Sequence, residues 1–310
     1  MSIGSLMAVN LLSSKALGPI AQLASNWRSL ARANEATARL QAALQEPVEP
    51  EAQTLELPRP RGAFRLDQVS FQYPNGHMAL DNVSLQIGPG GIHAIVGRNG
   101  AGKSTLAKLL AGLYQPTQGS IALNEYDLAQ FARADLGRWI GCLAQQTYWF
   151  SGPIVEGLRL VNPEADDKQI LAASQLSGAH AFISRLPQGY QTELGEGGAG
   201  LSAGELRKLG LAQLFLRNPS VLILDEPSND LDFDSETALL QTLRHIAQKH
   251  TVIVVTHSAR VASQAQHVYH VRGDGGVDQG LPDKMLPLLF GITLRSAPSA
   301  NAAVQTQEAA

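Results

Sequence analysis

The stretch Ile92-His-Ala-Ile-Val-Gly-Arg-Asn-Gly-Ala-Gly-Lys-Ser-Thr105 decides the fold of this chain. It begins as an apolar run and continues as the pattern GxxxxGKS, followed by a threonine, over residues 97–105. A strand before this pattern and a helix after it form the context in which such a loop binds phosphate. The leucines expected on one face of the following helix are Leu106, Leu109, Leu110 and Leu113.

The loop over residues 97–105 has the composition that a triphosphate requires. Its glycines let the main chain wrap closely around an anion, because a Cβ atom would block the approach. Main-chain amides and the N-terminus of the next helix add partial positive charge. Lys103 supplies a full charge at the β- and γ-phosphates, and the Ser104 hydroxyl is a ligand for Mg²⁺. The residues expected to bind nucleotide here are Gly97, Arg98, Asn99, Gly100, Ala101, Gly102, Lys103, Ser104 and Thr105.

Two further apolar runs end in chemically active side chains. The run Val221-Leu-Ile-Leu-Asp-Glu226 is typical of a central parallel strand, and parallel sheets bind ligands at the C-terminal ends of their strands. The acidic pair alone could be a simple turn; beside a phosphate loop, we expect Asp225 at the metal. Glu226 is then the general base for the attacking water. The run over residues 251–256 brings His257 to the same edge, where it can contact the γ-phosphate and hold Glu226 in place.

The prolines separate the chain into parts. Four of them lie within residues 46–60, which favours an extended connector over a helix. Before them, Leu23, Trp27 and Leu30 recur at helical spacing; after them, strand and helix patterns alternate, which predicts a parallel sheet. The expected domains are a helical part over residues 1–45, a linker over 46–62, an ATP-binding domain over 63–280, and a C-terminal helix with a disordered tail over 281–310.

Composition excludes several classes of protein. The 310 residues are 44% apolar and 16% charged, so the chain can bury a core. A formal net charge of −3 provides no strong basic field, and no nucleic-acid partner is expected. The single cysteine, Cys142, cannot form an intrachain disulfide, and no cysteine–histidine cluster indicates zinc. These features favour a reducing compartment.

The N-terminal apolar patch, residues 3–12, has two interpretations. Ser5 and Asn10 interrupt it, and it is too short to span a bilayer alone. Lys15 follows the patch, whereas a secretory signal carries its basic residues in front. The patch is either a helix packed on a protein surface or the cytoplasmic end of a membrane helix. The residues alone leave both open.

From about Phe64 to Val271, the chain resembles the nucleotide-binding domain of ABC transporters, with the motifs in the same order. Leu201-Ser-Ala-Gly-Glu205 is similar to the family signature LSGGQ. The resemblance implies an α/β P-loop NTPase of ABC type, with a parallel core, an antiparallel β subdomain and a helical subdomain. It implies ATP and Mg²⁺ as cofactors. It also implies a head-to-tail dimer, in which Ser202 and Gly204 of one copy meet ATP bound by the other.

The resemblance assigns further roles by position. Tyr73 corresponds to the aromatic residue that stacks on adenine. Gln145 corresponds to the loop glutamine that joins the Mg²⁺ shell and senses the transmembrane partner. Asp225 and Glu226 match the metal-binding and catalytic carboxylates, and His257 matches the switch histidine. The catalytic residues implied are therefore Glu226, His257 and Gln145, and the metal ligands are Ser104, Gln145 and Asp225.

Other segments resemble those of exporters. Residues 150–154 and 192–201 are similar to exporter-type segments, in which Glu196 would face the membrane domain. Residues 1–44 resemble the end of the last transmembrane helix in type I secretion permease/ATPases. The resemblance implies an ATPase that powers export of a protein or peptide at the cytoplasmic face of the inner membrane. A second ATP-binding domain and a transmembrane permease domain would be its partners.

Two other functions stay open at this point. One is a soluble ABC-type ATPase that acts as a clamp or regulator on nucleic acid or ribosomes, although a single cassette and an acidic balance disfavour it. The other is a truncated fragment that binds ATP and couples to nothing.

Three residues depart from the family pattern. Ala203 replaces the first signature glycine, which is harmless only if its φ is negative. Glu205 replaces glutamine; facing the phosphates it would weaken dimer closure, and facing solvent it would change little. Asp230 stands where the family often has a small neutral residue. A working but slow ATPase is the expectation.

Overall fold

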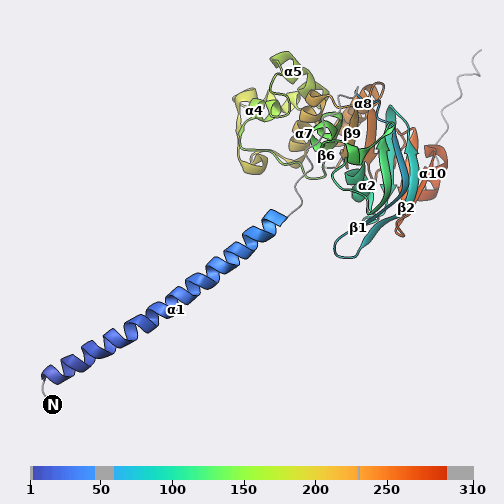
Figure 1. Ribbon diagram of the computed structural model, residues 1–310. Coiled ribbons are helices and arrows are strands. Elements are labelled where there is room, and N and C mark those ends of the chain that lie inside the picture. The colour runs from blue at the N-terminus through green and yellow to red at the C-terminus, as the bar shows by residue number, and fades with distance from the viewer. Residues whose placement is uncertain (1–2, 46–58, 230, 292–310) are drawn as a thin grey trace, which may run out of the picture. The chain divides into compact units, whose positions relative to one another are not determined.

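The computed structural model describes residues 3–45, 59–229 and 231–291 (Figure 1). The chain divides into two compact units, Met1–Glu51 and Ala52–Ala310. Most of the expected linker over residues 46–62 lies outside the described residues, as do Asp230 and residues 292–310, which include the expected disordered tail.

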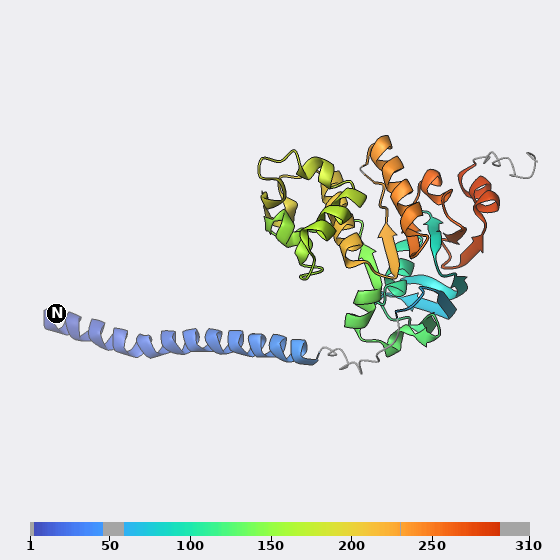
Figure 2. The ribbon, with the colours of Figure 1, turned by 90° about the horizontal axis from the view of Figure 1, so that it is seen from above.

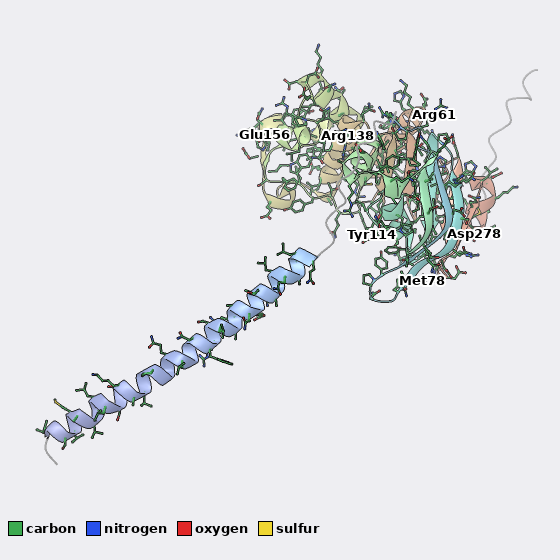
Figure 3. All side chains as sticks on the ribbon, in the orientation of Figure 1. Arg61, Met78, Tyr114, Arg138, Glu156 and Asp278 are labelled. Carbon is green, nitrogen blue, oxygen red and sulfur yellow. The ribbon has the colours of Figure 1, made fainter. Side chains whose placement is uncertain are left out.

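The first unit contains one long helix, α1 (Ile3–Gln45), of 43 residues with Pro19 inside it (Figure 2). The sequence suggested a separate apolar patch followed by a helix from about Ile20, whereas the structure has a single continuous helix. Its large apolar side chains, such as Leu12 and Trp27, are exposed, and those drawn in Figure 3 project from all sides of the helix. Within the described ranges, no helix has the length and apolar character needed to cross a membrane.

The second unit is built around a six-stranded sheet in which β12 alone is antiparallel to its neighbour. The strand order is β12 (Val277–Gly280), β11 (His267–Val271), β3 (Gly91–Gly97), β10 (Thr251–Val255), β9 (Val221–Asp225) and β6 (Ile140–Leu143). The three apolar runs of the sequence become β3, β9 and β10. β10 is buried along its whole length, which explains why it lacks alternating polar residues.

A second, antiparallel sheet packs beside the first (Figure 1). Its order is β2 (Met78–Ile87), β1 (Phe64–Gln72), β4 (Gln118–Leu123) and β5 (Tyr126–Asp127). Helix α2 (Lys103–Leu110) shares one apolar core with both sheets, and Leu106, Leu109 and Leu110 are fully buried in it. The expectation for Leu113 was wrong: α2 ends at Leu110, and Leu113 is 53% exposed.

The remaining helices form a helical subdomain and a cover for the sheet. The subdomain has its own core around Trp149, Ile154 and Leu209. It comprises β7 (Gly152–Pro153), α4 (Ile154–Arg159), α5 (Asp167–Leu176), α6 (His180–Ile183), η2 (Gly189–Gln191), β8 (Glu193–Leu194), η3 (Glu196–Gly198) and α7 (Ala203–Arg217). The other helices are η1 (Leu128–Gln130), α3 (Arg133–Trp139), α8 (Phe233–Ile246), α9 (Ala259–Ala262) and α10 (Pro282–Phe290). The architecture is thus the α/β arrangement that the sequence predicted, with parallel, antiparallel and helical parts.

Candidate active site

The strand order brings four segments to one edge of the main sheet. β3, β10, β9 and β6 are neighbours and run parallel, so their C-terminal ends lie together. Taken in this order, the four strands lead to the phosphate loop (residues 97–105), His257, the pair Asp225–Glu226 and Gln145. Because parallel sheets bind ligands beyond these strand ends, this edge is the candidate active site.

The phosphate loop is shaped by glycines and closed by Lys103. Gly102 has φ +103°, and a Cβ there would lie 2.6 Å from the Ala79 carbonyl oxygen, so only glycine fits. Gly100 has φ +79° with open space where a Cβ would stand, which leaves room for an anion. The Lys103 side chain is buried, and its Nζ donates to the carbonyl oxygens of Gly97 and Arg98, both at 3.0 Å. The Lys103 ammonium group is therefore already held next to the phosphate loop.

Ser104 and Asp225 bring together two oxygen atoms that could bind a metal ion. The Ser104 hydroxyl donates to Asp225 Oδ2 at 2.9 Å, although the two residues are 121 positions apart. A hydroxyl and a carboxylate oxygen are ligands that suit Mg²⁺. Their chemistry and proximity therefore fit the metal that the sequence implied at these residues.

Glu226 is buried in an uncommon main-chain conformation. Its φ is +51°, in the left-handed region, which costs a residue with a Cβ about 1–3 kcal/mol. Its Oε1 lies 2.8 Å from Nδ1 of His257, whose side chain is 62% exposed. Its Oε2 is buried and has no hydrogen-bond partner among the residues that the structure describes. One carboxylate oxygen is thus held by histidine, and the other is enclosed by the protein.

Gln145 joins this edge through its main chain. Its side chain is exposed, and its carbonyl oxygen accepts a hydrogen bond from Nη2 of Arg207 at 2.7 Å. Arg207 is a residue that sequence reasoning missed. It is buried on the same face of α7 as Leu211 and Leu214. A charged residue at a helical spacing otherwise occupied by leucines was the sequence feature that could have pointed to it.

Tyr73 lies beside the first turn of α2. Its hydroxyl shares a hydrogen bond with Thr105 Oγ1 at 2.9 Å. Its ring makes edge contacts with Phe71 and Tyr114, at centroid distances of 5.0 and 6.1 Å. These contacts fix the aromatic side chain close to the phosphate loop.

The signature segment, residues 201–205, has a local structure of its own. Ser202 is the N-cap of α7, and the helix begins at Ala203. Glu205 Oε2 accepts hydrogen bonds from the Ser202 amide at 2.8 Å and the Ser202 hydroxyl at 2.7 Å. The carboxylate therefore folds back over the helix N-terminus, an arrangement that neither expectation for Glu205 described. Ala203 is helical and is absent from the residues with positive φ, so its substitution for glycine is tolerated.

The signature segment does not join the phosphate loop within one chain. Among the contacts of the described residues, no hydrogen bond or ion pair connects residues 201–205 to residues 97–105. Ser202 and Gly204 therefore lie at the start of α7 and do not contact the phosphate loop of their own chain through these bonds. Their contact with the nucleotide of a second copy stays a prediction.

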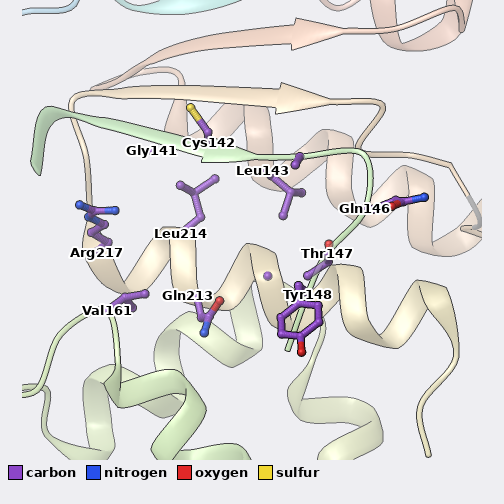
Figure 4. Close-up of a pocket in the computed structure, with 12 residues that line it drawn as sticks. Gly141, Cys142, Leu143, Gln146, Thr147, Tyr148, Val161, Gln213, Leu214 and Arg217 are labelled. Carbon is purple, nitrogen blue, oxygen red and sulfur yellow. The ribbon is translucent and has the colours of Figure 1, made fainter. Parts of the chain in front are cut away.

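A pocket of about 220 Å³ lies beside Gln145, between β6 and α7 (Figure 4). Cys142, Gln146, Tyr148, Gln213 and Arg217 are among its lining residues. Cys142 is an exposed residue, yet the protein atoms around its sulfur partly desolvate it and raise the pKa of the thiol to about 11, against the lowering effect of the Arg217 charge.

Two exporter-type positions, Phe150 and Glu196, lie next to Tyr148, which lines this pocket. The Tyr148 hydroxyl donates to Glu196 Oε1 at 3.3 Å, and the Tyr148 and Phe150 rings meet edge to face at 5.6 Å. Phe150 is 65% exposed. An exposed aromatic pair beside a carboxylate is a surface suited to another protein segment.

Comparisons with known proteins find similar chains among ABC transporters. The model of the ABC transporter family matches residues 80–229. The cyclolysin secretion/processing ATP-binding protein CyaB of Bordetella pertussis is 35% identical over 287 residues, which cover 92% of this chain and 40% of the relative. The leukotoxin export ATP-binding protein LtxB of Aggregatibacter actinomycetemcomitans is 34% identical over 287 residues, covering 92% of this chain and 41% of the relative. The chain thus spans about two-fifths of the length of these curated relatives.

A solved structure is also similar. A bacterial Atm1-family ABC exporter with ATP bound matches with a TM-score of 0.76 and 29% sequence identity. The match covers 93% of this chain and 51% of that chain.

Proposed function

The chain belongs to the ABC transporter family, and we propose that it is the ATP-binding and ATP-hydrolysing part of an exporter. In this proposal, ATP closes a head-to-tail dimer and hydrolysis reopens it, which powers the export of a protein or peptide. The names of two relatives refer to cyclolysin secretion and leukotoxin export, which supports this class of cargo. The observation that carries the proposal is the placement of the Ser104–Asp225 and Glu226–His257 pairs at strand ends beside the phosphate loop.

The phosphate loop binds the triphosphate. Its amides and the N-terminus of α2 face the phosphate oxygens. When ATP binds, the Lys103 ammonium group gives up its hydrogen bonds to the carbonyl oxygens of Gly97 and Arg98 and donates to the phosphate oxygens instead. The exchange is favourable because an ionised phosphate is a stronger acceptor for an ammonium group than a neutral carbonyl. Tyr73, held by Thr105, packs against the adenine ring.

Ser104 and Asp225 would hold Mg²⁺, with Gln145 as a further ligand. When bound, this ion neutralises charge on the β- and γ-phosphates.

Glu226 and His257 act on the attacking water. The Glu226 carboxylate accepts a proton from the water as the water oxygen bonds to the γ-phosphorus and the bond from the γ-phosphorus to the β–γ bridging oxygen breaks. The released pair of electrons stays on the ADP oxygen. The hydrogen bond between His257 Nδ1 and Glu226 Oε1 holds the carboxylate in place for this step.

The rest of the assembly is proposed by analogy with the exporters that the chain resembles. A second copy, or a related ATP-binding domain, would bring its Ser202 and Gly204 to the nucleotide. The surface of Tyr148, Phe150 and Glu196 would face a transmembrane domain, at the cytoplasmic face of the inner membrane. We assign residues 63–280 to the ATPase domain, and residues 1–45 to the end of the last transmembrane helix and its cytoplasmic extension.

Binding and turnover of ATP by the purified chain test the proposal. We expect affinity for ATP that depends on Mg²⁺, and hydrolysis whose specific rate rises with protein concentration because dimers form. No affinity for adenine nucleotide would overturn the proposal. Affinity for nucleic acid together with recovery wholly in the soluble fraction of cells would favour the clamp function instead.

A further inference from the structure

Arg207 connects three segments of the candidate active site. It lies on α7, five positions after Ser202, and is only 5% exposed. Its Nη1 donates to the main-chain carbonyl of Glu226, and its Nη2 donates to that of Gln145 at 2.7 Å. One guanidinium group therefore joins the helix that begins at the signature segment to the ends of β9 and β6.

The contact with Glu226 falls on the peptide group whose conformation is unusual. Glu226 has φ +51°, and its amide donates to the Val255 carbonyl at 2.9 Å. Its own carbonyl accepts from Arg207 and also from the Asn229 amide at 3.2 Å. A left-handed residue with a Cβ persists only where its surroundings hold it, and Arg207 is one of these restraints.

The conformation of the main chain decides where the Glu226 carboxylate points. The direction of the Cα–Cβ bond follows from φ and ψ, so a group that fixes the peptide also fixes the starting direction of the side chain. That side chain reaches His257 with Oε1 and leaves Oε2 buried without a partner among the described residues. A relaxed peptide would turn the carboxylate away from this arrangement.

We propose that Arg207 is a positioning residue for ATP hydrolysis, an inference that rests on the function proposed above. It holds the Glu226 main chain so that the carboxylate faces the attacking water. It also transmits the position of the signature segment to Glu226 and Gln145. Ser202 and Arg207 are separated by about 7–8 Å along one rigid helix, so a displacement of Ser202 by the second copy's nucleotide moves Arg207 with it.

An arginine suits this role better than a lysine. Its planar fork directs two N–H groups at two acceptors at the same time, whereas an ammonium group is a point charge without fixed directions. These two acceptors are carbonyl oxygens from two different segments, which a fork can reach at the same time.

The experiment compares Arg207→Met and Arg207→Lys with Arg217→Met in the full chain. Arg217 is the last residue of the same helix and gives the same change of side chain away from both carbonyls. For each protein we would measure affinity for a fluorescent ATP analogue with Mg²⁺, kcat and KM for ATP, the melting temperature, and amide hydrogen exchange.

We expect Arg207→Met to lower kcat by about tenfold or more, and to leave KM and ATP affinity within about threefold. Exchange should accelerate at the Asn229 amide and stay unchanged in the phosphate loop. Arg207→Lys should recover part of kcat, and Arg217→Met should match the wild type. In a Glu226→Gln background, Arg207→Met should lower the residual rate by less than about twofold, because the two residues act together.

A folded Arg207→Met variant with wild-type kcat would overturn the inference. So would a variant in which KM, ATP affinity and melting temperature fall in step with kcat, since that pattern indicates a purely structural role. If Arg207→Met does not fold, Arg207→Lys decides, and wild-type kcat in that variant would be contrary to the proposal. A wild-type chain that fails to bind ATP would instead refute the proposed function itself.

Discussion

The phosphate-loop edge and the signature segment are built in different ways. At the edge, Lys103 and Glu226 are buried, and the contacts of Ser104 and Glu226 join residues 121 and 31 positions apart. At the signature segment, Ser202 is exposed, and its side-chain contacts come from Glu205, three positions away. The first region is completed by the fold of one chain, whereas the second is held by its own helix cap. In the proposed dimer, the phosphate-loop edge would therefore be a finished half-site, whose residues are already in contact. The signature segment would be an unfinished half-site, which needs the nucleotide of a second copy.

ATP binding at the phosphate-loop edge should depend most strongly on Lys103. Lys103→Ala removes the ammonium group from the phosphate loop, so ATP affinity should fall by about 100-fold. This corresponds to ~3 kcal/mol for the lost charge-assisted hydrogen bonds. Lys108→Ala is the matched control, because Lys108 is exposed on the same helix and contacts the Tyr114 ring. Calorimetry with Mg²⁺ and ATP measures both. If Lys103→Ala bound ATP as tightly as the control, the edge would not be a finished half-site.

A second prediction separates binding from chemistry at the same edge. Glu226→Gln keeps the shape of the side chain and a hydrogen bond to His257 but removes the base. Hydrolysis should fall by about 100-fold or more while ATP still binds. The variant should then accumulate as an ATP-bound dimer, which light scattering after size exclusion can detect. A species that stays monomeric at saturating ATP would remove support for a cross-chain role of Ser202.

The sequence predicted the finished half-site better than the connections around it. The phosphate loop, Asp225, Glu226 and His257 could be placed together because each follows an apolar run, and parallel strands align their ends. Arg207 could not be placed, since its carbonyl partners come from distant segments that only the tertiary fold brings near. The left-handed φ of Glu226 was equally hidden, because glutamate has no intrinsic preference for that region.

The unfinished half was predictable in one respect that the sequence reasoning overlooked. Ser202-Ala-Gly-Glu205 has the S-x-x-E pattern of a capping box, which would have set the start of α7 at Ala203 and folded Glu205 back onto Ser202. The continuity of α1 through Pro19 was less accessible, since a proline inside a helical pattern normally marks a boundary.

A mixing experiment tests whether the unfinished half is completed by a second copy. Lys103→Ala and Ser202→Ala should each be nearly inactive alone, the first through lost ATP binding and the second through a lost contact across the dimer. Mixed in equal amounts, half of the dimers should contain one intact composite site, which restores up to about a quarter of wild-type ATPase activity. The ATPase rate of the mixture measures this. Strictly additive activities would contradict the head-to-tail arrangement.

The smallest expected effect concerns the cap itself. Glu205 places a carboxylate on the Ser202 donors, which the phosphates of a second copy's ATP would also need. Glu205→Gln should keep the capping box, because glutamine also serves at this position, and should remove the competing charge. ATP-driven dimerisation should then strengthen by about two- to fivefold, or ~0.5–1 kcal/mol for a partly exposed charge.

Sedimentation at two ionic strengths measures this effect, which should shrink in high salt because the repulsion is screened. Asp283→Asn is the matched control, since Asp283 is an exposed acid in the first turn of α10 and belongs to neither half-site. If Glu205→Gln dimerised no better than Asp283→Asn, the carboxylate would be a helix cap without influence on closure. The slow ATPase expected from the sequence would then have to originate at the phosphate-loop edge, and the two regions would differ in construction but not in their effect on rate.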